Sequence, residues 1–213
     1  ELLQEALLRA VVLHRGCVLA EAVAEMSEIA VRGEDRGEDA LHPVARMPAR
    51  VPSELVLAIA RRESEFDPYV ISPVGARGLM QVMPKTAKEM ADRVGLRYSQ
   101  KRLEIDWAYN ARIGITYLEE LAERYAGNPV LMSVAYNAGP SRADRWIELM
   151  GDPRMDAVDV IDWIEMAPFQ ETRNYIMRVT ESLPIYQARL GKPIAPKSFE
   201  AMLKGSSLSL RAP

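Results

Sequence analysis

Hydrophobic residues recur at helical spacing along most of the chain, and no stretch alternates apolar and polar residues for long enough to form a strand of useful length. Glycine, proline and short polar segments separate these periodic stretches. The pattern predicts helices over residues 52–66, 84–94, 107–126, 129–137, 141–150, 158–166 and 169–190, the last with a kink at Pro184. The expected fold class is therefore mainly α, with at most a small β-hairpin near residues 70–74.

The start of the chain is expected to form a separate segment. Residues 2–29 are rich in Leu, Ala, Glu and Val, which predicts one or two extra helices that dock on the following domain or on helices further upstream. Three prolines then favour extended or irregular chain over residues 41–51. The expected organisation is an N-terminal helical segment and linker at 1–45, a main domain at 46–190 and a C-terminal tail at 191–213.

One carboxylate follows a stripe of apolar residues. In the expected helix, Val56, Ile59 and Ala60 recur at helical spacing, and Glu63 is the next residue of that stripe. An acid that is removed from water without a cationic partner has a raised pKa, which suits a general acid that works near neutral pH. An acid at a helix end can also be an ordinary cap of the following loop, so this pattern alone leaves both interpretations open.

The overall composition excludes several classes of function. The 213-residue chain contains 48% hydrophobic and 27% charged residues, which is typical of a globular protein. Its formal charge of -3 and sequence pI near 5.6 argue against nucleic acid as the main partner, because phosphate binding needs a basic surface. No apolar run is long enough to predict a transmembrane segment. No signal peptide is recognisable at Glu1, so we expect a processed chain or the C-terminal piece of a longer one.

Metal and cofactor chemistry finds no support in the sequence. Cys17 is the single cysteine, so no internal disulfide is expected, and with only His14 and His42 no cysteine/histidine zinc spacing can be built. The phosphate-binding and dinucleotide-binding glycine motifs and the serine nucleophile elbow are missing from the sequence. We therefore expect no cofactor and no metal, and carboxylate chemistry becomes the strongest enzyme hypothesis.

Three polar clusters lie at expected element ends, where a helical domain can bring them together at a groove. They are Glu63-Ser64, the segment GLMQVM at 78–83 and the segment AYNAG at 135–139. Together with DAV at 156–158 and PFQETR at 168–173, they closely resemble the catalytic domain of the soluble lytic transglycosylases. This family, the family 1 lytic transglycosylases, is goose-type lysozyme-like and cuts peptidoglycan. The resemblance covers roughly residues 52–190 and implies a lysozyme-like helical domain.

The resemblance also implies roles for particular residues. The family's single catalytic glutamate is matched by Glu63. The family's substrate contacts are matched by Ser72, Gln81, Met83, Tyr136, Asn137 and Glu171. Structural explanations stay open for four of these: Tyr136 as a packing residue, Met83 as a core residue, Ser72 as a turn residue and Glu171 as a charge favoured at a helix N-terminus.

The implied reaction needs one carboxylate, whereas ordinary glycosidases need two. Glu63 would protonate the oxygen between N-acetylmuramic acid and N-acetylglucosamine, while the sugar's own acetamido group stabilises the anomeric centre. The ionised Glu63 would then take the proton of the muramoyl C6 hydroxyl, which closes a 1,6-anhydro ring without water. Such intramolecular attack benefits from an effective molarity of about 10⁵ M or more when it is well oriented.

Three alternatives compete with this hypothesis: a hydrolytic muramidase of the same fold, a non-catalytic glycan-binding scaffold and a helical interaction domain. Glu63 in an apolar setting argues against a scaffold, and an interaction domain would leave the polar clusters unexplained. The partner implied by the resemblance is the peptidoglycan glycan strand. The implied location is periplasmic, with an export signal that is not present in this chain.

Overall fold

Helices form nearly all of the regular structure. The computed structural model describes residues 41–192 and 198–205. Within these ranges the chain forms nine α-helices, one 3-10 helix and isolated β-bridges in place of a sheet. The expected fold class, mainly α, is confirmed. The helices expected over residues 2–29 lie outside the described residues.

Most helices lie where the apolar spacing predicts them. Their bounds are η1 Pro43–Arg46, α3 Ser53–Ser64, α4 Pro84–Arg93, α5 Gln100–Ile105, α6 Trp107–Tyr125, α7 Pro129–Ala138, α8 Pro140–Met150, α9 Val160–Glu165, α10 Gln170–Arg189 and α11 Phe199–Leu203. Asp106 caps α6 by accepting a hydrogen bond from the backbone N–H of Tyr109 (3.0 Å). Proline begins α4, α7 and α8, because its fixed φ suits the first turn of a helix.

Two helix boundaries differ from the prediction for local reasons. Helix α3 ends at Ser64 and not at residue 66, because Glu65 and Phe66 adopt left-handed φ values of 52° and 68°. Helix α9 begins at Val160 and not at residue 158, because the Asp159 carboxylate accepts hydrogen bonds from two backbone N–H groups of the first turn. Helix α10 continues through the proline at which a kink was expected.

Three short helices were missed by the sequence pattern. Helix η1 lies in the segment that was expected to be irregular, α5 lies in a predicted connection, and α11 lies in the expected tail. Each begins at a side-chain cap, namely His42, Ser99 and Ser198. Each buries only one or two residues, such as Leu103 in α5, so the apolar period is too short to detect.

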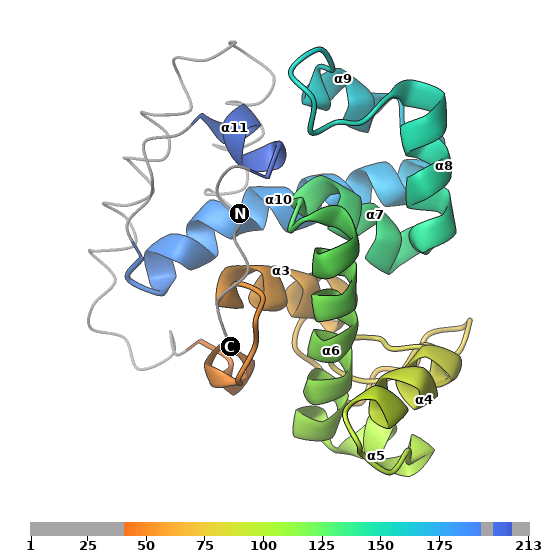
Figure 1. The fold of residues 1–213 in the computed structure, drawn as a ribbon. Coiled ribbons are helices and arrows are strands. Elements are labelled where there is room, and N and C mark those ends of the chain that lie inside the picture. The colour runs from red at the N-terminus through yellow and green to blue at the C-terminus, as the bar shows by residue number, and fades with distance from the viewer. Residues whose placement is uncertain (1–40, 193–197, 206–213) are drawn as a thin grey trace.

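Helix α3 is the centre of the fold. Residues 55–60 are each at most 1% exposed, so the helix is covered on all sides. Helix α10 packs along α3 and α7, and α6 contacts α4, α5 and α7. In Figure 1, α4 and α5 lie at the lower end of α6, whereas α8 and α9 lie at the top. Packing on all sides therefore fixes the position and direction of α3.

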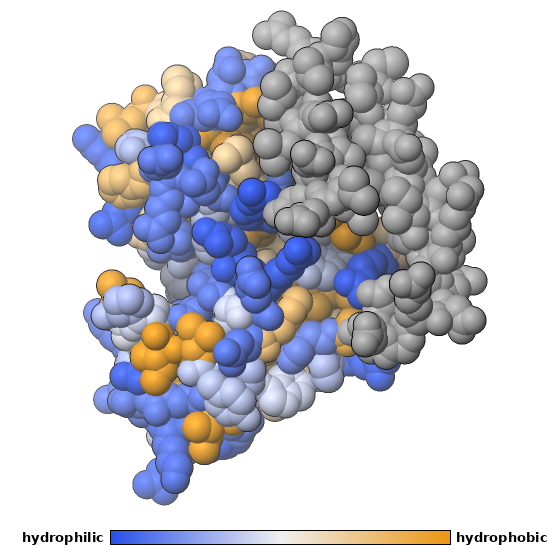
Figure 2. Space-filling view, turned by 180° about the vertical axis from the view of Figure 1, so that it is seen from behind, coloured by the Kyte–Doolittle hydropathy of each residue, from blue (hydrophilic) through white to orange (hydrophobic). Residues whose placement is uncertain are grey.

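The surface is hollowed at one edge, between an upper and a lower lobe at the left of Figure 2. The corresponding side of Figure 1 has α8 above, and α4 with the loop 65–83 below. The C-terminal end of α3 runs towards this side of the molecule (Figure 1). We call the hollow between α8 and this loop the groove.

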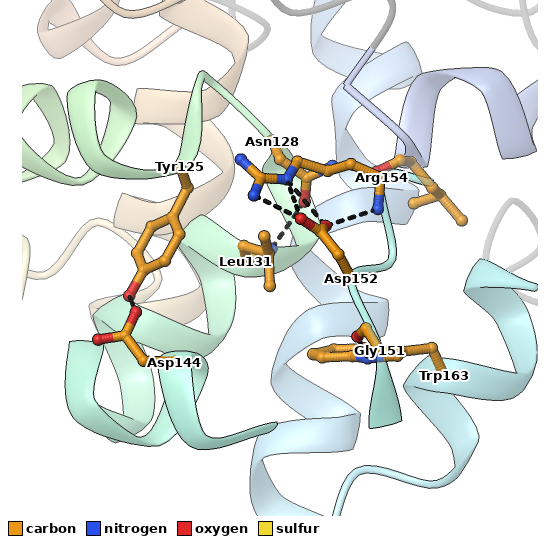
Figure 3. Close-up of polar contacts among 9 residues, drawn as sticks. Tyr125, Asn128, Leu131, Asp144, Gly151, Asp152, Arg154 and Trp163 are labelled. Carbon is orange, nitrogen blue, oxygen red and sulfur yellow. Dashed lines mark hydrogen bonds and ion pairs between the residues drawn. The ribbon is translucent and has the colours of Figure 1, made fainter. Parts of the chain in front are cut away.

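Hydrogen bonds to backbone carbonyls hold the upper lobe together (Figure 3). The Trp163 indole of α9 donates to the Gly151 carbonyl at the end of α8 (2.9 Å). The Asn128 amide, which caps α7, also donates to the carbonyl of the last residue of α11 (2.8 Å). In the loop between α8 and α9, Arg154 pairs with Asp152 (2.6 Å). Polar contacts thus tie α8 to α9 and α7 to α11, in addition to packing.

Gly114 allows the loop 65–83 to pack directly on α6. A Cβ atom at this position would lie 2.6 Å from the Met80 Sδ and 2.8 Å from the Met80 Cβ. Met80 is fully buried at 0% exposure, so it has little room to withdraw. The glycine therefore sets how closely the loop approaches the helix.

We expect Gly114→Ala to lower the free energy of unfolding by about 1–3 kcal/mol, because overpacking outweighs the gain in helix propensity of up to about 1 kcal/mol. Urea unfolding measures this change. In a Met80→Ala background the same substitution should cost less, since the sulfur and its methyl group are gone and only the Cβ atom at 2.8 Å remains close. An equal loss in both backgrounds would show that the sulfur and methyl group of Met80 are not the obstacle.

Candidate active site

Glu63 lies in the last turn of α3, where its side chain is partly exposed. The hydroxyl of Tyr175, a residue of α10 that is 2% exposed, donates a hydrogen bond to Glu63 Oε1 (2.6 Å). Burial raises the pKa of Glu63 to about 7, although the Tyr175 hydrogen bond and the Arg62 charge lower it; the Glu171 charge adds a small upward contribution. Because burial dominates, this carboxyl can both release and accept a proton near neutral pH.

The charge of Glu63 influences the pKa of two tyrosines, Tyr136 and Tyr175. Burial, and then the charge of Glu63, raises the pKa of Tyr136 and of Tyr175 well above the usual value. Both phenols are therefore neutral hydrogen-bond donors near neutral pH. Sequence analysis named Tyr136 but missed Tyr175. A signal was available, because Tyr175 follows Glu171 by one helical turn in the QETRNY segment.

The loop 65–83 is tied to the end of α3 and to α7. The Ser64 hydroxyl donates to the Leu79 carbonyl (2.7 Å), and the Tyr136 hydroxyl donates to the Met80 carbonyl (2.8 Å). Leu79 and Met80 are both 0% exposed, so these backbone carbonyls need protein partners. The phenol of Tyr136 therefore has a structural role, which agrees with one of the two explanations left open by the sequence.

Asn110 of α6 holds the same loop from the other side. This residue is 1% exposed, and its Oδ1 accepts a hydrogen bond from the Met80 backbone N–H (2.8 Å). Its Nδ2 donates to the carbonyls of Arg77 (2.7 Å) and Leu103 (2.9 Å). Gly78 makes this contact possible, since its φ is 71° and a Cβ atom there would lie 2.4 Å from Asn110 Nδ2. Sequence analysis missed Asn110, whose only signal is a polar residue within a buried helix.

The predicted contacts Ser72, Gln81 and Met83 all lie on the loop 65–83 or at its end. Ser72 Oγ accepts a hydrogen bond from the Ala76 backbone N–H (2.9 Å), as expected of a turn residue. The Gln81 amide donates to the carbonyls of Val70 (2.9 Å) and Gly78 (2.8 Å). Met83 is 42% exposed at the start of α4, so the open explanation that it is a core residue is wrong. These bonds use neither the Ser72 hydroxyl proton nor the Gln81 amide oxygen.

The remaining predicted contacts join α7 to α10. Asn137, near the end of α7, accepts a hydrogen bond through Oδ1 from the Thr172 hydroxyl (2.8 Å). Glu171 is exposed in the first turn of α10 and is close enough to influence the Glu63 charge. The structure thus gathers Glu63, Tyr136 and Glu171 into one electrostatic environment. Contact of any of these side chains with a substrate stays a prediction.

In the described ranges no group of three or more His, Cys, Asp or Glu side chains is arranged to hold a metal ion. The groups around Glu63 are phenols, a guanidinium and a second carboxylate. These groups can support proton transfer to and from the partly buried carboxyl of Glu63.

Comparison with known proteins agrees with this geometry. Residues 44–157, more than half of the chain, match the family described as "Transglycosylase SLT domain". The chain belongs to this family. The resemblance predicted from the polar clusters is therefore confirmed.

This SLT domain is similar to soluble lytic transglycosylases of known sequence and structure. It is 36% identical over 142 residues to the soluble lytic murein transglycosylase of Escherichia coli K12, covering 66% of this chain and 21% of the relative. It superposes on the 70 kDa soluble lytic transglycosylase of Escherichia coli with a TM-score of 0.60 and 31% identity, over 79% of this chain and 24% of the other. For an inactive glutamate-to-glutamine mutant of Slt from Pseudomonas aeruginosa the TM-score is 0.62 and the identity 34%, over 81% and 28%. The SLT domain chain thus spans only 21% to 28% of the length of these relatives.

The raised pKa of Glu63 predicts a pH dependence of stability. Glu63 is protonated in both the folded and the unfolded state below its ordinary pKa of 4.5, so folding carries no penalty there. As the pH rises from 4.5 to about 7, only the unfolded state ionises freely, and stability is lost. We expect Glu63→Gln to become more stable than the wild type over this window, by about 1–3 kcal/mol at pH 8. Urea unfolding at several pH values measures the difference, and a constant difference between pH 4 and 8 would contradict the burial of this carboxyl.

Removing the Tyr175 hydroxyl should raise the pKa of Glu63 further, because that hydroxyl stabilises the charged carboxylate. The test is the titration of the Glu63 carboxyl by carbon NMR in Tyr175→Phe. Tyr125→Phe is the matched control, since its hydroxyl bonds to Asp144 (3.0 Å) and not to Glu63. A titration midpoint that falls in Tyr175→Phe, or that moves equally in the control, would show that the hydrogen bond does not act on Glu63.

Proposed function

We propose that this SLT domain is a peptidoglycan lytic transglycosylase. It cleaves the β-1,4 bond between N-acetylmuramic acid and N-acetylglucosamine without water and leaves a 1,6-anhydro-N-acetylmuramic acid end. The observation that carries the proposal is the Glu63 carboxyl, which is partly exposed yet has its pKa raised to about 7 by burial. The similarity to soluble lytic transglycosylases supports the same reaction class.

In the first step Glu63 acts as general acid. With a pKa of about 7 it keeps its proton until the glycosidic oxygen reaches it, and it is strong enough to donate that proton as the bond breaks. The substrate's acetamido group stabilises the positive charge that develops at the anomeric carbon. The hydroxyl of Tyr175 stabilises the carboxylate that Glu63 becomes, because it already donates to Oε1.

In the second step the same carboxylate acts as general base. It removes the proton of the muramoyl C6 hydroxyl, and that oxygen attacks the anomeric carbon of its own sugar. The proton returns to Glu63, so the residue ends in its starting state and no water is consumed. Ring closure competes well with hydrolysis because the attacking group is tethered to the sugar.

The expected substrate contacts come from both sides of Glu63. Ser72, Gln81 and Met83 lie on or beside the loop below the groove, and Asn137 and Glu171 lie at the adjoining ends of α7 and α10. We propose that the exposed Met83 side chain contacts the apolar face of a sugar ring. Polar groups of Ser72 and Gln81 then fix the orientation of that ring.

One observation favours a second candidate, a hydrolytic muramidase of the same fold. Glu171 is near enough to Glu63 for its charge to raise the pKa of the catalytic carboxyl, and a hydrolase needs a second acid of this kind to activate water. Glu171 is, however, exposed to solvent at a helix N-terminus. We therefore assign it to ligand contact and not to catalysis.

The partner proposed for the domain is the glycan strand of peptidoglycan. This substrate lies outside the cytoplasmic membrane, so we propose a periplasmic location. In the described part of the chain no helix has both the length and the apolar character that a membrane crossing requires.

The deciding experiment compares Glu63→Gln with the wild type on intact cell-wall sacculi. We expect turnover to fall by about 10²–10⁴-fold, because the amide keeps the shape of the side chain but cannot donate the proton. Mass spectrometry should find anhydro products from the wild type, each lighter by one water than the hydrolysed product. Glu165→Gln, at an exposed site of α9, is the matched control and should keep full activity.

Reducing-end products from the wild type, lost again in Glu171→Gln, would establish the muramidase instead. Glycan binding without release of any soluble product would establish a scaffold. The relative from Pseudomonas aeruginosa, which is inactive as a glutamate-to-glutamine mutant, shows that one such change can remove activity in this family.

A further inference from the structure

The turn that follows Glu63 has an unusual backbone. Glu65 and Phe66 both adopt left-handed φ values, 52° and 68°, and neither is glycine. Two such residues in succession cost free energy, so the surrounding structure must hold the turn in place. Glu65 follows Glu63 by two residues and ends α3. The conformation of residues 65 and 66 therefore determines where the last helical turn, which carries Glu63, comes to lie.

An aromatic cluster holds this turn from outside the helix. The His42 ring stacks on the Phe66 ring with centroids 5.3 Å apart and planes within 9° of parallel. The Trp107 ring at the start of α6 meets the same imidazole edge-on, with centroids 5.1 Å apart and an interplanar angle of 84°. His42 therefore lies between the turn and α6 and fixes Phe66 relative to the core.

The orientation of the imidazole is itself fixed. His42 caps η1, and its Nδ1 accepts a hydrogen bond from the backbone N–H of Val44 (3.2 Å). Val44 is 1% exposed, and η1 packs on α3. Burial lowers the pKa of His42, so the ring is neutral near neutral pH and Nδ1 stays an acceptor. The ring is thus anchored to the backbone on one side and to two aromatic rings on the others.

We infer that His42 is a positioning residue for Glu63: through its stack on Phe66 it maintains the left-handed turn that keeps the Glu63 carboxyl against the Tyr175 hydroxyl. His42 does not touch the reacting atoms and acts only through the turn. The catalytic consequence of this inference rests on the proposed function of Glu63. The structural consequence, the burial of the carboxyl, can be measured without any turnover.

The test compares His42→Ala with His42→Phe in the full chain. Alanine removes the stack, so Glu63 should become more hydrated and its contact with Tyr175 should weaken. Because burial outweighs the Tyr175 hydrogen bond in setting the pKa of Glu63, its NMR titration midpoint should fall, by about one pH unit. If the wild type is active, the kcat of His42→Ala should be lower by about tenfold or more, while its KM should change little. The reason is that the acid is misplaced but the substrate contacts remain. Phenylalanine restores a ring that can stack on Phe66 but lacks the Nδ1 acceptor, so it should recover most of the change in both the midpoint and kcat.

Met202→Ala controls for a general loss of stability. Met202 is 6% exposed in α11, which packs on α7 and α9. This variant should lower the thermal midpoint and leave the titration of Glu63 unchanged. Should His42→Ala not fold, Phe66→Leu keeps an apolar side chain at the turn but removes the ring that stacks, and it should shift the midpoint in the same direction.

An unchanged Glu63 midpoint in the folded His42 or Phe66 variant would overturn the inference. So would an equal shift in Met202→Ala, because the effect would then reflect stability alone. If the midpoint shifts as expected but the wild type makes no anhydro product, the proposed function fails while the positioning role stands. If the wild type is active and the midpoint does not move, the positioning role fails alone.

Discussion

The burial of one carboxyl against one phenol is the interaction on which the site depends. A carboxylate removed from water loses more free energy than a single neutral hydrogen bond restores, so the protonated form of Glu63 is favoured up to a pH of about 7. The core makes this burial possible because α10 packs along α3 and brings Tyr175 to the last turn of that helix. Burial, with a small contribution from the Glu171 charge, thereby gives a weak acid the proton affinity that the proposed general-acid step needs near neutral pH.

The loop beside this carboxyl is held by side chains that satisfy its buried backbone. Ser64, Asn110 and Tyr136 approach it from three different helices, and each bonds to a main-chain group that would otherwise be unpaired. Their hydrogen bonds explain why a polar segment can lie against the core without forming a sheet. The hydroxyl of Tyr136 therefore supports the loop, and the charge of Glu63 contributes to the raised pKa of the same phenol.

Much of this structure could be predicted because it depends on residues that are close to one another in the sequence. Long helices follow from their apolar period. Glu63 is indicated by its place on the apolar stripe after Ile59, together with the nearby motifs that resemble the soluble lytic transglycosylases. The parts that could not be predicted depend on contacts distant in sequence or on backbone geometry. Tyr175 lies 112 residues from Glu63, and its role appears only once α10 is placed on α3. The left-handed conformation of Phe66 has no sequence signal, because glycine is absent from that turn.

The enclosure of α3 on every side has a consequence for how the proposed reaction proceeds. A helix whose middle residues are at most 1% exposed cannot slide or rotate without disturbing the entire core, so the backbone that carries Glu63 is fixed. The Tyr175 hydroxyl in addition holds one oxygen of its carboxyl. Yet the two proton transfers involve different oxygens of the sugar, one at the departing bond and one on the sixth carbon. The sugar must therefore change its ring conformation and its position relative to Glu63 between the two proton transfers, while the protein backbone stays in place.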